Sequence, residues 1–535
     1  MFIPLLVTDF VKRATRHYGK KVGVVDGEKR FTYAQFGERV NRLSNALLRL
    51  GIKKGDRVAV LDTNSHRLLE MYYGIPQIGA ILLPINIRLL AKDITYVLND
   101  SEARCLMVNQ DLANLVEVSQ LKYVEKRVLL QDKPASKDLN IMGEKYETLL
   151  SHASPVIDGD LGLNENDPAE MFYTSGTTTQ PKGMFHTHRT LYLNALKDLF
   201  LAGTGGVSDS SIYLQTIPLF HANGWRKAHT ITMLGGRHIM LRQFRPEVVC
   251  ELIQNEKVTY FELVPTMADV LTQYEDIKKY DLSSVKRIVV GGAAMSKATH
   301  EKLITTFPSA MVFAGYGMSE TASVGTTAII KDHLQGLPEE EKRRLMRSQG
   351  FEDYITQIRV VDSSGKDVIP DGKHVGEIII RGNCIIDGYW KLPEVTQNTI
   401  VDGWLHSGDV ATIDENGYVQ IVDRLKDLII SGGENIGSIE IEDVIRTHPS
   451  VSEVAVVAAP HEKWGETPAA MVVLKPGTRL TEEKLITYCR KSLAGFKVPR
   501  IIQFRDDLPK GGTGKILKSR IKDELWKGYD RRVVS

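Results

Sequence analysis

The segment Tyr173–Gly183, YTSGTTTQPKG, combines hydroxyl groups, a glycine and one lysine in a pattern that suits binding of a polyphosphate. Gly176 allows the backbone to approach an anion closely, and nearby hydroxyls and N–H groups can donate to phosphate oxygens. Lys182 adds a positive charge at the end of the segment. The Walker pattern G-x-x-x-x-G-K-[ST] is absent here, so the segment does not predict a GTPase or mononucleotide kinase. A polar surface loop is the alternative for this segment alone. Its hydroxyl residues are Thr174, Ser175, Thr177 and Thr178.

Two glycine-containing segments could complete a nucleotide site. VGGAAMS, residues 290–296, follows a predicted strand, and its alternative interpretation is a simple turn. In GYGMSET, residues 315–321, Tyr316 stands between two glycines, where a flat ring could stack on a purine. Glu320 could hold a divalent cation that is itself bound to phosphates. The alternative for this segment is a tight turn with a solvated glutamate.

Two polar residues further along the chain carry weaker signals. Asp409, in HSGDVATID, could accept hydrogen bonds from ribose hydroxyls, although a lone aspartate in a turn is usually structural. Lys515 lies in the glycine-rich segment LPKGGTGKILK. A lysine in a charge-rich tail is usually just solvated, so Lys515 alone would indicate little.

The elements that must position these residues alternate between helix and strand. Thr32 and Gln35 form a capping-box pattern before apolar residues at helical spacing. Short apolar runs then recur between helical stretches, which predicts a large layered α/β domain with mostly parallel, buried strands. The predicted strands are Arg57–Leu61, Arg104–Val108, Arg127–Leu130, Ser211–Thr216, Tyr260–Val264 and Arg287–Val290.

The character of the chain changes after about Gly376. GEIIIRG is strand-like, and IDENGYVQIVDR places an Asn-Gly turn between two alternating runs, which predicts a hairpin in a β-rich subdomain. The rest, with strands at Val454–Ala458 and Ala470–Leu474, predicts a small mobile α/β domain. We place the boundary at Arg424, giving domains 1–423 and 424–535.

Bulk composition limits the classes of function. A chain of 535 residues with 42% apolar content predicts at least two domains. With 68 basic and 66 acidic side chains, the net charge of +2 provides no general field for nucleic acid. The four cysteines lack zinc or C-x-x-C spacing, which favours a reducing compartment. The N-terminal apolar run is too short for a transmembrane segment and predicts an amphipathic helix, so the cytoplasm is the expected location.

Taken together and in this order, the motifs resemble those of the adenylate-forming, acyl-activating enzymes. That superfamily includes acyl-CoA synthetases, peptide-synthetase adenylation domains and firefly luciferases, and the resemblance runs from FTYAQF through PINIRL to GKILK. It implies ATP, Mg²⁺ and coenzyme A as cofactors or co-substrates. A carboxylate would attack the α-phosphorus of ATP, and a thiol would then attack the acyl-adenylate; no protein nucleophile is needed.

The resemblance also implies roles for individual residues. Asp423 matches a hinge aspartate, about which the small domain would rotate between the two half-reactions. Lys515 and Glu320 would act in adenylation, with Glu320 and Thr174 helping to hold magnesium. The implied ATP- and AMP-binding residues are Thr174, Ser175, Gly176, Thr177, Thr178, Lys182, Gly292, Ala293, Gly315, Tyr316, Gly317, Ser319, Asp409, Arg424, Lys426 and Lys515. The implied coenzyme A loop, SGGENIG, contributes Gly432, Gly433 and Glu434.

The segment PLFHANGW, Pro218–Trp225, resembles the fatty-acyl-CoA synthetase branch most closely. The resemblance implies that His221 lies by the reacting carboxyl and that Trp225 gates an acyl tunnel, which predicts a medium- or long-chain fatty acid. A core tryptophan is the alternative for Trp225. No carrier-protein domain follows, so a free-standing ligase is expected, and analogy with relatives suggests a homodimer.

Three departures from the family pattern qualify this prediction. Thr179 replaces a usual glycine, and Ile430 and Asn435 stand where relatives of this branch can carry lysine and tryptophan. In WRKAH, residues 225–229, three ionisable side chains follow the gate: Arg226, Lys227 and His229. We expect a solvated helix face there; the alternative is that one of them binds a second polar or anionic group of the substrate.

Other functions stay open at this point. They are an acyl-AMP ligase that transfers to a carrier protein, a coenzyme A ligase for an aromatic or dicarboxylic acid, an oxygen-using luciferase-like enzyme, and a non-catalytic nucleotide-binding or scaffold protein. The presence of Glu320, Asp409 and Lys515 argues against the last, because a decayed site would tolerate their loss.

Overall fold

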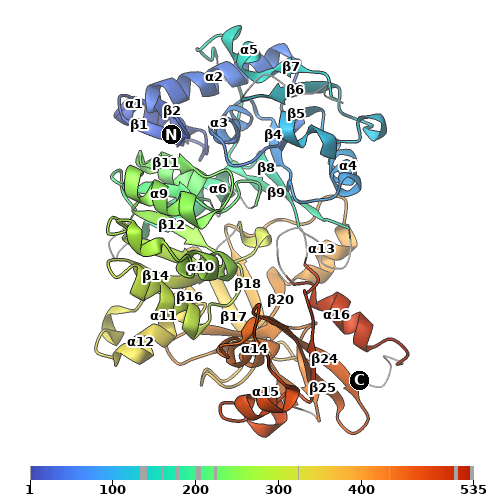
Figure 1. Cartoon of the computed structure of the whole chain (residues 1–535). Helices are drawn as coiled ribbons and strands as arrows, with labels where there is room; N and C mark the ends of the chain where they lie inside the picture. The colour runs from blue at the N-terminus through green and yellow to red at the C-terminus, as the bar shows by residue number, and fades with distance from the viewer. Residues whose placement is uncertain are drawn as a thin grey trace.

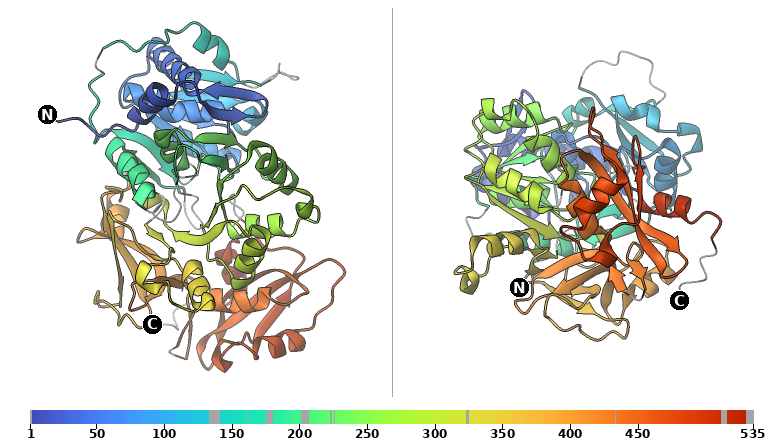
Figure 2. Two further views of the ribbon diagram at one scale, coloured as in Figure 1. Left: turned by 90° about the vertical axis from the view of Figure 1, so that its left-hand side faces the viewer. Right: turned by 60° about the horizontal axis from the view of Figure 1, so that its bottom comes forward.

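The computed structural model describes residues 2–132, 141–159, 161–174, 180–200, 207–221, 224, 226–322, 325–432, 434–510 and 516–529, with the side chains of residues 198 and 200 excepted. The predicted α/β architecture is confirmed. Figure 1 shows the N-terminal sheet at one end, a central sheet next to it, and the C-terminal domain at the other end. The left view in Figure 2 shows the same order, and the right view brings the C-terminal domain forward.

The N-terminal sheet is parallel except for its last strand, β9, which is antiparallel to β8. Its central strands are almost completely buried, which is why they read as continuous apolar runs. In spatial order the strands are β7 (Glu144–Lys145), β6 (Lys126–Leu130), β5 (Cys105–Asn109), β3 (Arg57–Leu61), β4 (Ile81–Pro84), β8 (Pro168–Tyr173) and β9 (Gly183–Thr187). The accompanying helices are α2 (Tyr33–Arg49), α3 (His66–Gly74), α4 (Ala91–Asp100) and α5 (Tyr146–Ser151). The capping box predicted at Thr32 and Gln35 begins α2.

The central sheet has a parallel core formed by β1, β11, β10, β12, β13 and β14. In spatial order it contains β16 (Phe351–Glu352), β15 (Thr326–Thr327), β14 (Met311–Tyr316), β13 (Arg287–Val290), β12 (Tyr260–Leu263), β10 (Ile212–Gln215), β11 (Arg237–Met240), β1 (Val22–Asp26) and β2 (Lys29–Thr32). One face packs on α9 (Pro246–Glu256), α10 (Pro265–Thr272) and α11 (Lys297–Thr306), with α12 (Glu339–Arg347) beside them.

Three helices separate the two sheets: α1 (Asp9–Tyr18), α6 (His188–Phe200) and α8 (Lys227–Leu234). Their apolar residues join those of α2, α3 and both sheets in one core that includes Phe10, Phe36, Ala195 and Ala228. Helix α8 is buried from Lys227 to Met233. It therefore faces protein on both sides, which bears directly on the ionisable residues at its start.

A β-rich subdomain follows, as predicted. It contains β17 (Thr356–Val361), β18 (Gly376–Gly382), β19 (Ile400–Val401), β20 (Trp404–Ile413) and β21 (Val419–Arg424), with α13 (Pro393–Thr399). Strands β20 and β21 form the predicted hairpin, with Gly417 at a φ of 78° in its turn. This left-handed conformation explains the Asn-Gly signal.

The C-terminal domain has apolar clusters of its own around Ile441, Val456 and Met471. Its sheet contains β22 (Ile429–Ser431), β23 (Glu434–Ile436), β24 (Val451–His461), β25 (Gly465–Leu474) and β26 (Ile501–Phe504). Its helices are α14 (Ser438–Arg446), α15 (Glu482–Cys489) and α16 (Lys518–Leu525). The domain boundary at Arg424 stays a prediction.

Cys105, Cys250, Cys384 and Cys489 are free and buried. Among the residues that the structure describes, no helix is both long and apolar enough to cross a membrane.

Candidate active site

The carboxyl ends of neighbouring parallel strands bring two of the glycine-containing motifs together. Strands β13 and β14 pair in register, so Gly292 and Ala293 after β13 lie beside Gly315 and Tyr316 at the end of β14. Gly292 has a φ of 76°, which a side chain would strain. Ligands of open parallel sheets bind at this edge. The structure therefore supports a binding site here, as the motifs predicted.

Tyr316 and the predicted ribose acceptor are in direct contact. The Tyr316 hydroxyl donates to Asp409 Oδ2 at 2.8 Å, although 93 residues separate them. Arg424 Nε lies 3.1 Å from Asp409 Oδ1, across the pairing of β20 with β21. Burial raises the pKa of Tyr316 well above its usual value, so the ring stays a neutral donor.

Glu320 is buried, at 7% exposure, so the solvated-glutamate alternative is wrong. Its Oε1 accepts a hydrogen bond from the Tyr389 hydroxyl at 2.8 Å, and Lys182 Nζ lies 5.2 Å from the centre of the Tyr389 ring. Burial raises the pKa of Glu320. A cation or a phosphate-bound metal at this carboxylate would therefore offset a real desolvation cost.

Sequence reasoning missed Tyr389, although this side chain links Glu320 to Lys182. Tyr389 also forms an isolated β-bridge with Met184, two residues after Lys182. The signal in the sequence was the dipeptide Gly388-Tyr389, in which an aromatic residue follows a glycine. The structure shows why position 388 is a glycine, since an added Cβ would come 2.6 Å from the Thr396 side chain. This pattern resembles the Gly315-Tyr316 signal that was used.

The two ends of the phosphate-binding segment are held together. Thr174 N–H donates to Lys182 O at 3.0 Å, and Lys182 N–H donates to Thr174 Oγ1 at 3.2 Å. Thr174, directly after β8, and Lys182, directly before β9, are thus held side by side. Several predicted site residues lie outside the described residues: Ser175, Gly176, Thr177, Thr178, Trp225, Gly433 and Lys515.

The remaining motif residues lie on short connections. Ser319 begins a 3₁₀ turn, Ser319–Thr321, which is separated from Gly317 only by Met318. His221 lies between β10 and α8 in a turn where its N–H donates to Pro218 O at 3.0 Å. Lys426 is exposed just after β21.

Asp423 connects the last strand of the β-rich subdomain with the first helix of the C-terminal domain. It is 2% exposed, and its Oδ2 accepts from Ser438 N–H at the start of α14 at 2.6 Å. A carboxylate at a helix N-terminus is electrostatically favourable. Gly432 and Glu434 belong to the β22–β23 hairpin, and Gly432 N–H donates to Trp464 O at 2.9 Å.

The prediction of a solvated helix face after the gate is wrong. Arg226, Lys227 and His229 are 1%, 4% and 0% exposed. Arg226 donates to the Asn194 side chain on α6, Lys227 Nζ lies 3.3 Å from Glu262 on β12, and His229 Nε2 lies 2.6 Å from Glu170 on β8. The cause is tertiary: α8 lies between two sheets, so its polar side chains find partners in both.

Magnesium would have one buried carboxylate here, Glu320, rather than a cage of protein ligands. In the described part of the chain, no group of three or more His, Cys, Asp or Glu side chains could hold a metal ion. That donor set fits Mg²⁺, which is commonly bound through one or two carboxylates together with substrate phosphates.

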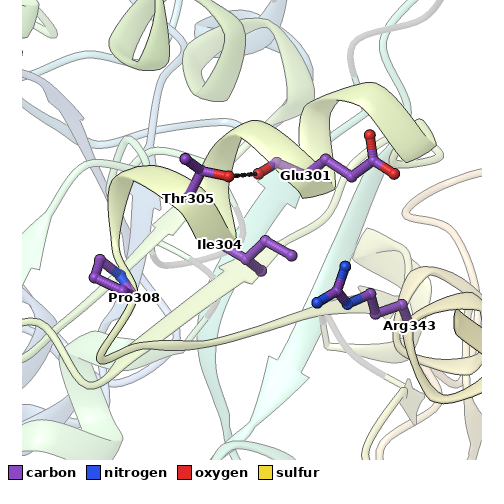
Figure 3. A pocket seen from close by; sticks show the side chains of 5 residues that line it. All are labelled: Glu301, Ile304, Thr305, Pro308 and Arg343. Atoms are coloured by element: carbon purple, nitrogen blue, oxygen red, sulfur yellow. Dashed lines mark hydrogen bonds between the residues drawn. The ribbon is translucent and has the colours of Figure 1, made fainter. Parts of the chain in front are cut away.

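A separate surface pocket of about 550 Å³ lies between α11 and α12 (Figure 3). Its lining residues are Glu301, Ile304, Thr305, Pro308 and Arg343. None of them belongs to the motifs above, so we assign the pocket no role in the site.

Comparison with known proteins agrees with this geometry. Residues 10–390 match the family of AMP-binding enzymes, and residues 440–515 match the AMP-binding enzyme C-terminal domain. The chain is 35% identical to a peroxisomal butyrate–CoA ligase of Arabidopsis thaliana, with 97% of this chain and 93% of the relative covered. It is 37% identical to a long-chain-fatty-acid–CoA ligase of Thermus thermophilus, with 97% and 95% covered.

A solved anthranilate CoA ligase in complex with anthranoyl-AMP superimposes with a TM-score of 0.86 over 98% of both chains; at 24% identity this shows the fold alone. The chain belongs to the AMP-binding, adenylate-forming enzyme family. It is an acid–thiol ligase of the AMP-forming acyl-CoA synthetase class.

Proposed function

We propose that this chain converts a carboxylic acid, ATP and coenzyme A into acyl-CoA, AMP and pyrophosphate through an acyl-adenylate, with the residue roles given below. The observation that carries the assignment is the contact between Tyr316 and Asp409, with Arg424 on the same aspartate. Tyr316 and the β20–β21 hairpin, far apart in the sequence, thereby bring a ring, a carboxylate and a cation together, which supports binding of a nucleoside monophosphate.

The chain's own residues bind and orient the two anions that must meet. Lys182 and the loop begun by Thr174 hold the outer phosphates, while Ser319 contacts the α-phosphate. Asp409 takes the ribose hydroxyls, and Gly292, Ala293 and Tyr316 enclose the adenine. Arg424, Lys426 and Lys515 add positive charge near the sugar and α-phosphate. Alignment and charge neutralisation then supply most of the rate enhancement.

Glu320 is the residue that would hold magnesium, together with Thr174. When bound, the metal supplies neutralisation of phosphate charge. The buried carboxylate is suited to this because Tyr389 orients it through a hydrogen bond, and Lys182 Nζ lies over the Tyr389 ring.

The thioester-forming step uses the hinge at Asp423 and the loop that contains Gly432, Gly433 and Glu434. Rotation about Asp423 would withdraw Lys515 and bring this loop to the acyl-adenylate. The hydrogen bond from Ser438 N–H to Asp423 couples the hinge residue to α14, so the helix would move with it.

The class of acid is a separate question. The named relatives act on acids as different as butyrate and long-chain fatty acids. The medium- or long-chain fatty acid predicted from PLFHANGW therefore stays a prediction, as do an aromatic or dicarboxylic acid, transfer to a carrier protein, a cytoplasmic location and a homodimer.

The test is a screen of short, medium, long, aromatic, hydroxylated and dicarboxylic acids for pyrophosphate release, each with and without coenzyme A. We expect AMP, pyrophosphate and a coenzyme A thioester for at least one acid. Formation of ADP and orthophosphate would contradict the proposal, and AMP release that ignores coenzyme A would favour an acyl-AMP ligase.

The division of labour between half-reactions has its own test. Lys515→Ala should abolish adenylation yet spare thioester formation from a supplied acyl-adenylate. Equal loss of both half-reactions would refute the assigned roles of Lys515 and the hinge.

A further inference from the structure

One face of the central sheet carries hydrogen-bonding side chains where it approaches the site. Side chains alternate between the two faces of a strand. On β12, Phe261 and Leu263 join the apolar core with α9–α11, whereas Tyr260 and Glu262 face the other way, towards α8. The same alternation holds on the neighbouring strands. The α8-facing residues are Tyr213 and Gln215 on β10, Tyr260 and Glu262 on β12, Arg287 and Val289 on β13, and Met311, Phe313 and Gly315 on β14.

This polar face continues directly into the nucleotide motifs. Glu262 pairs in register with Val289, and a Cβ placed on Gly315 would lie 3.7 Å from Val289 Cγ1. Glu262, Val289 and Gly315 are thus neighbours across three adjacent strands. With strands about 4.8 Å apart, and Gly315 two residues beyond Phe313, the register partner of Val289, the Cα atoms of Glu262 and Gly315 lie roughly 12 Å apart. This separation is comparable to the length of a short acyl chain. Gly315, from which it is measured, directly precedes Tyr316, whose ring is predicted to stack on the adenine.

Glu262 is the centre of a buried polar cluster. It accepts from the Tyr260 hydroxyl at 2.7 Å and the Tyr213 hydroxyl at 3.2 Å, and Lys227 Nζ lies 3.3 Å from it. Glu262 is 2% exposed and Tyr213 is 0% exposed. A buried ion pair is rarely more stabilising than apolar residues of the same size. Stability therefore does not explain why this polar cluster occupies the face of the sheet that leads towards Gly315.

Gln215 carries the most specific signal. It is fully buried, its Nε2 donates to Ile217 O at 2.8 Å, and in the described residues its Oε1 has no hydrogen-bond partner. It also packs under the backbone of Gly224, in the segment that holds His221, because a Cβ on Gly224 would come 2.2 Å from Gln215 Nε2. A buried acceptor left unpaired costs about 1–3 kcal/mol. A ligand that donates a hydrogen bond would remove that cost.

Resting on the function proposed above, we propose that the acid substrate is a short one with a hydroxyl group at the end away from its carboxylate, and that Gln215 and the Glu262–Lys227 pair recognise this hydroxyl. A hydroxyl can donate to the oxygens of Gln215 or Glu262 and accept from Lys227, so it matches both kinds of group. An alkyl chain at the same place would leave the Gln215 Oε1 atom without a hydrogen-bond donor. Sites built to bind a hydroxyl reject analogues that lack it for this reason.

The first test compares matched acids on the parent enzyme. Coenzyme A thioester formation is measured for butyrate against 4-hydroxybutyrate and for hexanoate against 6-hydroxyhexanoate, with adipate and decanoate added. We expect kcat/KM at least tenfold higher for the hydroxylated member of at least one pair than for its plain partner. A preference for plain or dicarboxylic acids would overturn the inference.

The second test removes the recognising groups. Gln215→Leu should lower the ratio of kcat/KM for the hydroxylated acid over the plain acid at least fivefold, mainly through KM. The double variant Lys227→Met/Glu262→Leu should do the same and keeps the test available if Gln215→Leu fails to fold. An unchanged ratio in a folded variant would overturn the inference.

A matched control uses a second buried ion pair. Arg39 Nε lies 2.6 Å from Glu70, between α2 and α3, and Glu70 also accepts from the Tyr146 hydroxyl at 2.7 Å. The double variant Arg39→Met/Glu70→Leu should leave the substrate ratio as in the parent. If no acid in the panel gives a thioester, the proposed function itself fails; if thioesters form without hydroxyl preference, only the present inference fails.

Discussion

The two faces of the central sheet differ sharply although they share the same strands. Towards α9–α11, residues such as Phe261, Ile288 and Val290 form a dry core with exposures of 0%. Towards α8, the same strands present Tyr260, Glu262 and other polar groups, equally buried but linked by hydrogen bonds. Both faces exclude water. Burial therefore does not separate a core face from a functional face; the chemical nature of the buried groups does.

The difference also teaches where stability and function reside. The apolar face gains free energy from burial, at roughly 25 cal/mol per Å². The polar face carries desolvation costs that its internal bonds only offset. Substitutions on the apolar face should therefore mainly lower the free energy of unfolding, whereas substitutions on the polar face should mainly change activity or its dependence on conditions.

Truncating the apolar face should have the largest effect. Phe261→Ala removes a ring whose centre lies 5.7 Å from that of Phe307, and we expect a loss of about 3–5 kcal/mol in the free energy of unfolding. Thermal or denaturant unfolding followed by circular dichroism measures it. The control on the polar face, Tyr260→Phe, should cost about 1 kcal/mol. Equal losses would erase the contrast between the faces.

Neutralising the carboxylate at the edge of the sheet should separate activity from stability. In Glu320→Gln we expect adenylation to fall about a hundredfold, because one preorganised electrostatic group is lost. Burial raises the pKa of Glu320, so burying its charge costs free energy in the folded state and the neutral isostere should not destabilise it. Pyrophosphate exchange and a melting curve check both halves; a strongly lowered melting point would contradict the argument.

Adjacent valines on β13 offer the most direct comparison of the two faces. Val290→Thr places a hydroxyl in the apolar core, and we expect a loss of about 1–3 kcal/mol in the free energy of unfolding. Val289→Thr places it on the polar face beside Glu262, where it can find a partner, so the loss should be less than half as large. Denaturant titration of both variants decides the matter, and a larger loss at Val289 would contradict the assignment of the faces.

The polar face should also make folding sensitive to acid. His238 is fully buried, and burial lowers its pKa to about 3. Below about pH 6.5 His238 is protonated in the unfolded chain, whereas in the folded chain it stays neutral down to about pH 3. The free energy of unfolding therefore decreases as the pH drops from about 6.5 to about 3. The slope is at most about 1.4 kcal/mol per pH unit for this one group.

His238→Gln should therefore flatten the decline of the melting temperature between pH 6.5 and 4.5. The exposed His17 supplies the control, and His17→Gln should leave the slope as in the parent. Parallel curves for parent and His238→Gln would show that His238 is not a source of the acid sensitivity.

Local patterns predicted most elements, because their causes are local. The strand Arg287–Val290 was predicted with its observed bounds, and the capping box at Thr32 begins α2 as expected. The hairpin at Gly417 followed from an Asn-Gly turn. The motifs also singled out Tyr316 and Asp409, which the structure brings into contact, and Glu320, which it buries; their roles in binding stay predictions.

Two features escaped local reasoning. Tyr389 lies between Glu320 and Lys182 only because an isolated β-bridge joins it to Met184. The charges of Arg226, Lys227 and His229 suggested a solvated helix face, yet all three are buried. A charge pattern does not state which elements will pack on a helix, and the partners of these side chains come from α6, β12 and β8, all distant in sequence or facing from another layer.

The amino-acid sequence by itself determined the family, the strands and the order of the nucleotide motifs, since hydrophobic periodicity and loop chemistry are properties of short segments. The tertiary structure alone decided which face of the central sheet is polar, because alternation along a strand acquires meaning only when its neighbours and covering helix are known. It also decided that Glu262 and Lys227 pair with each other and share with Gln215 the face of the sheet that carries Gly315. The physical reason is that the pairing register between strands distant in the sequence, and not the local propensity of any one strand, brings these side chains to the same face.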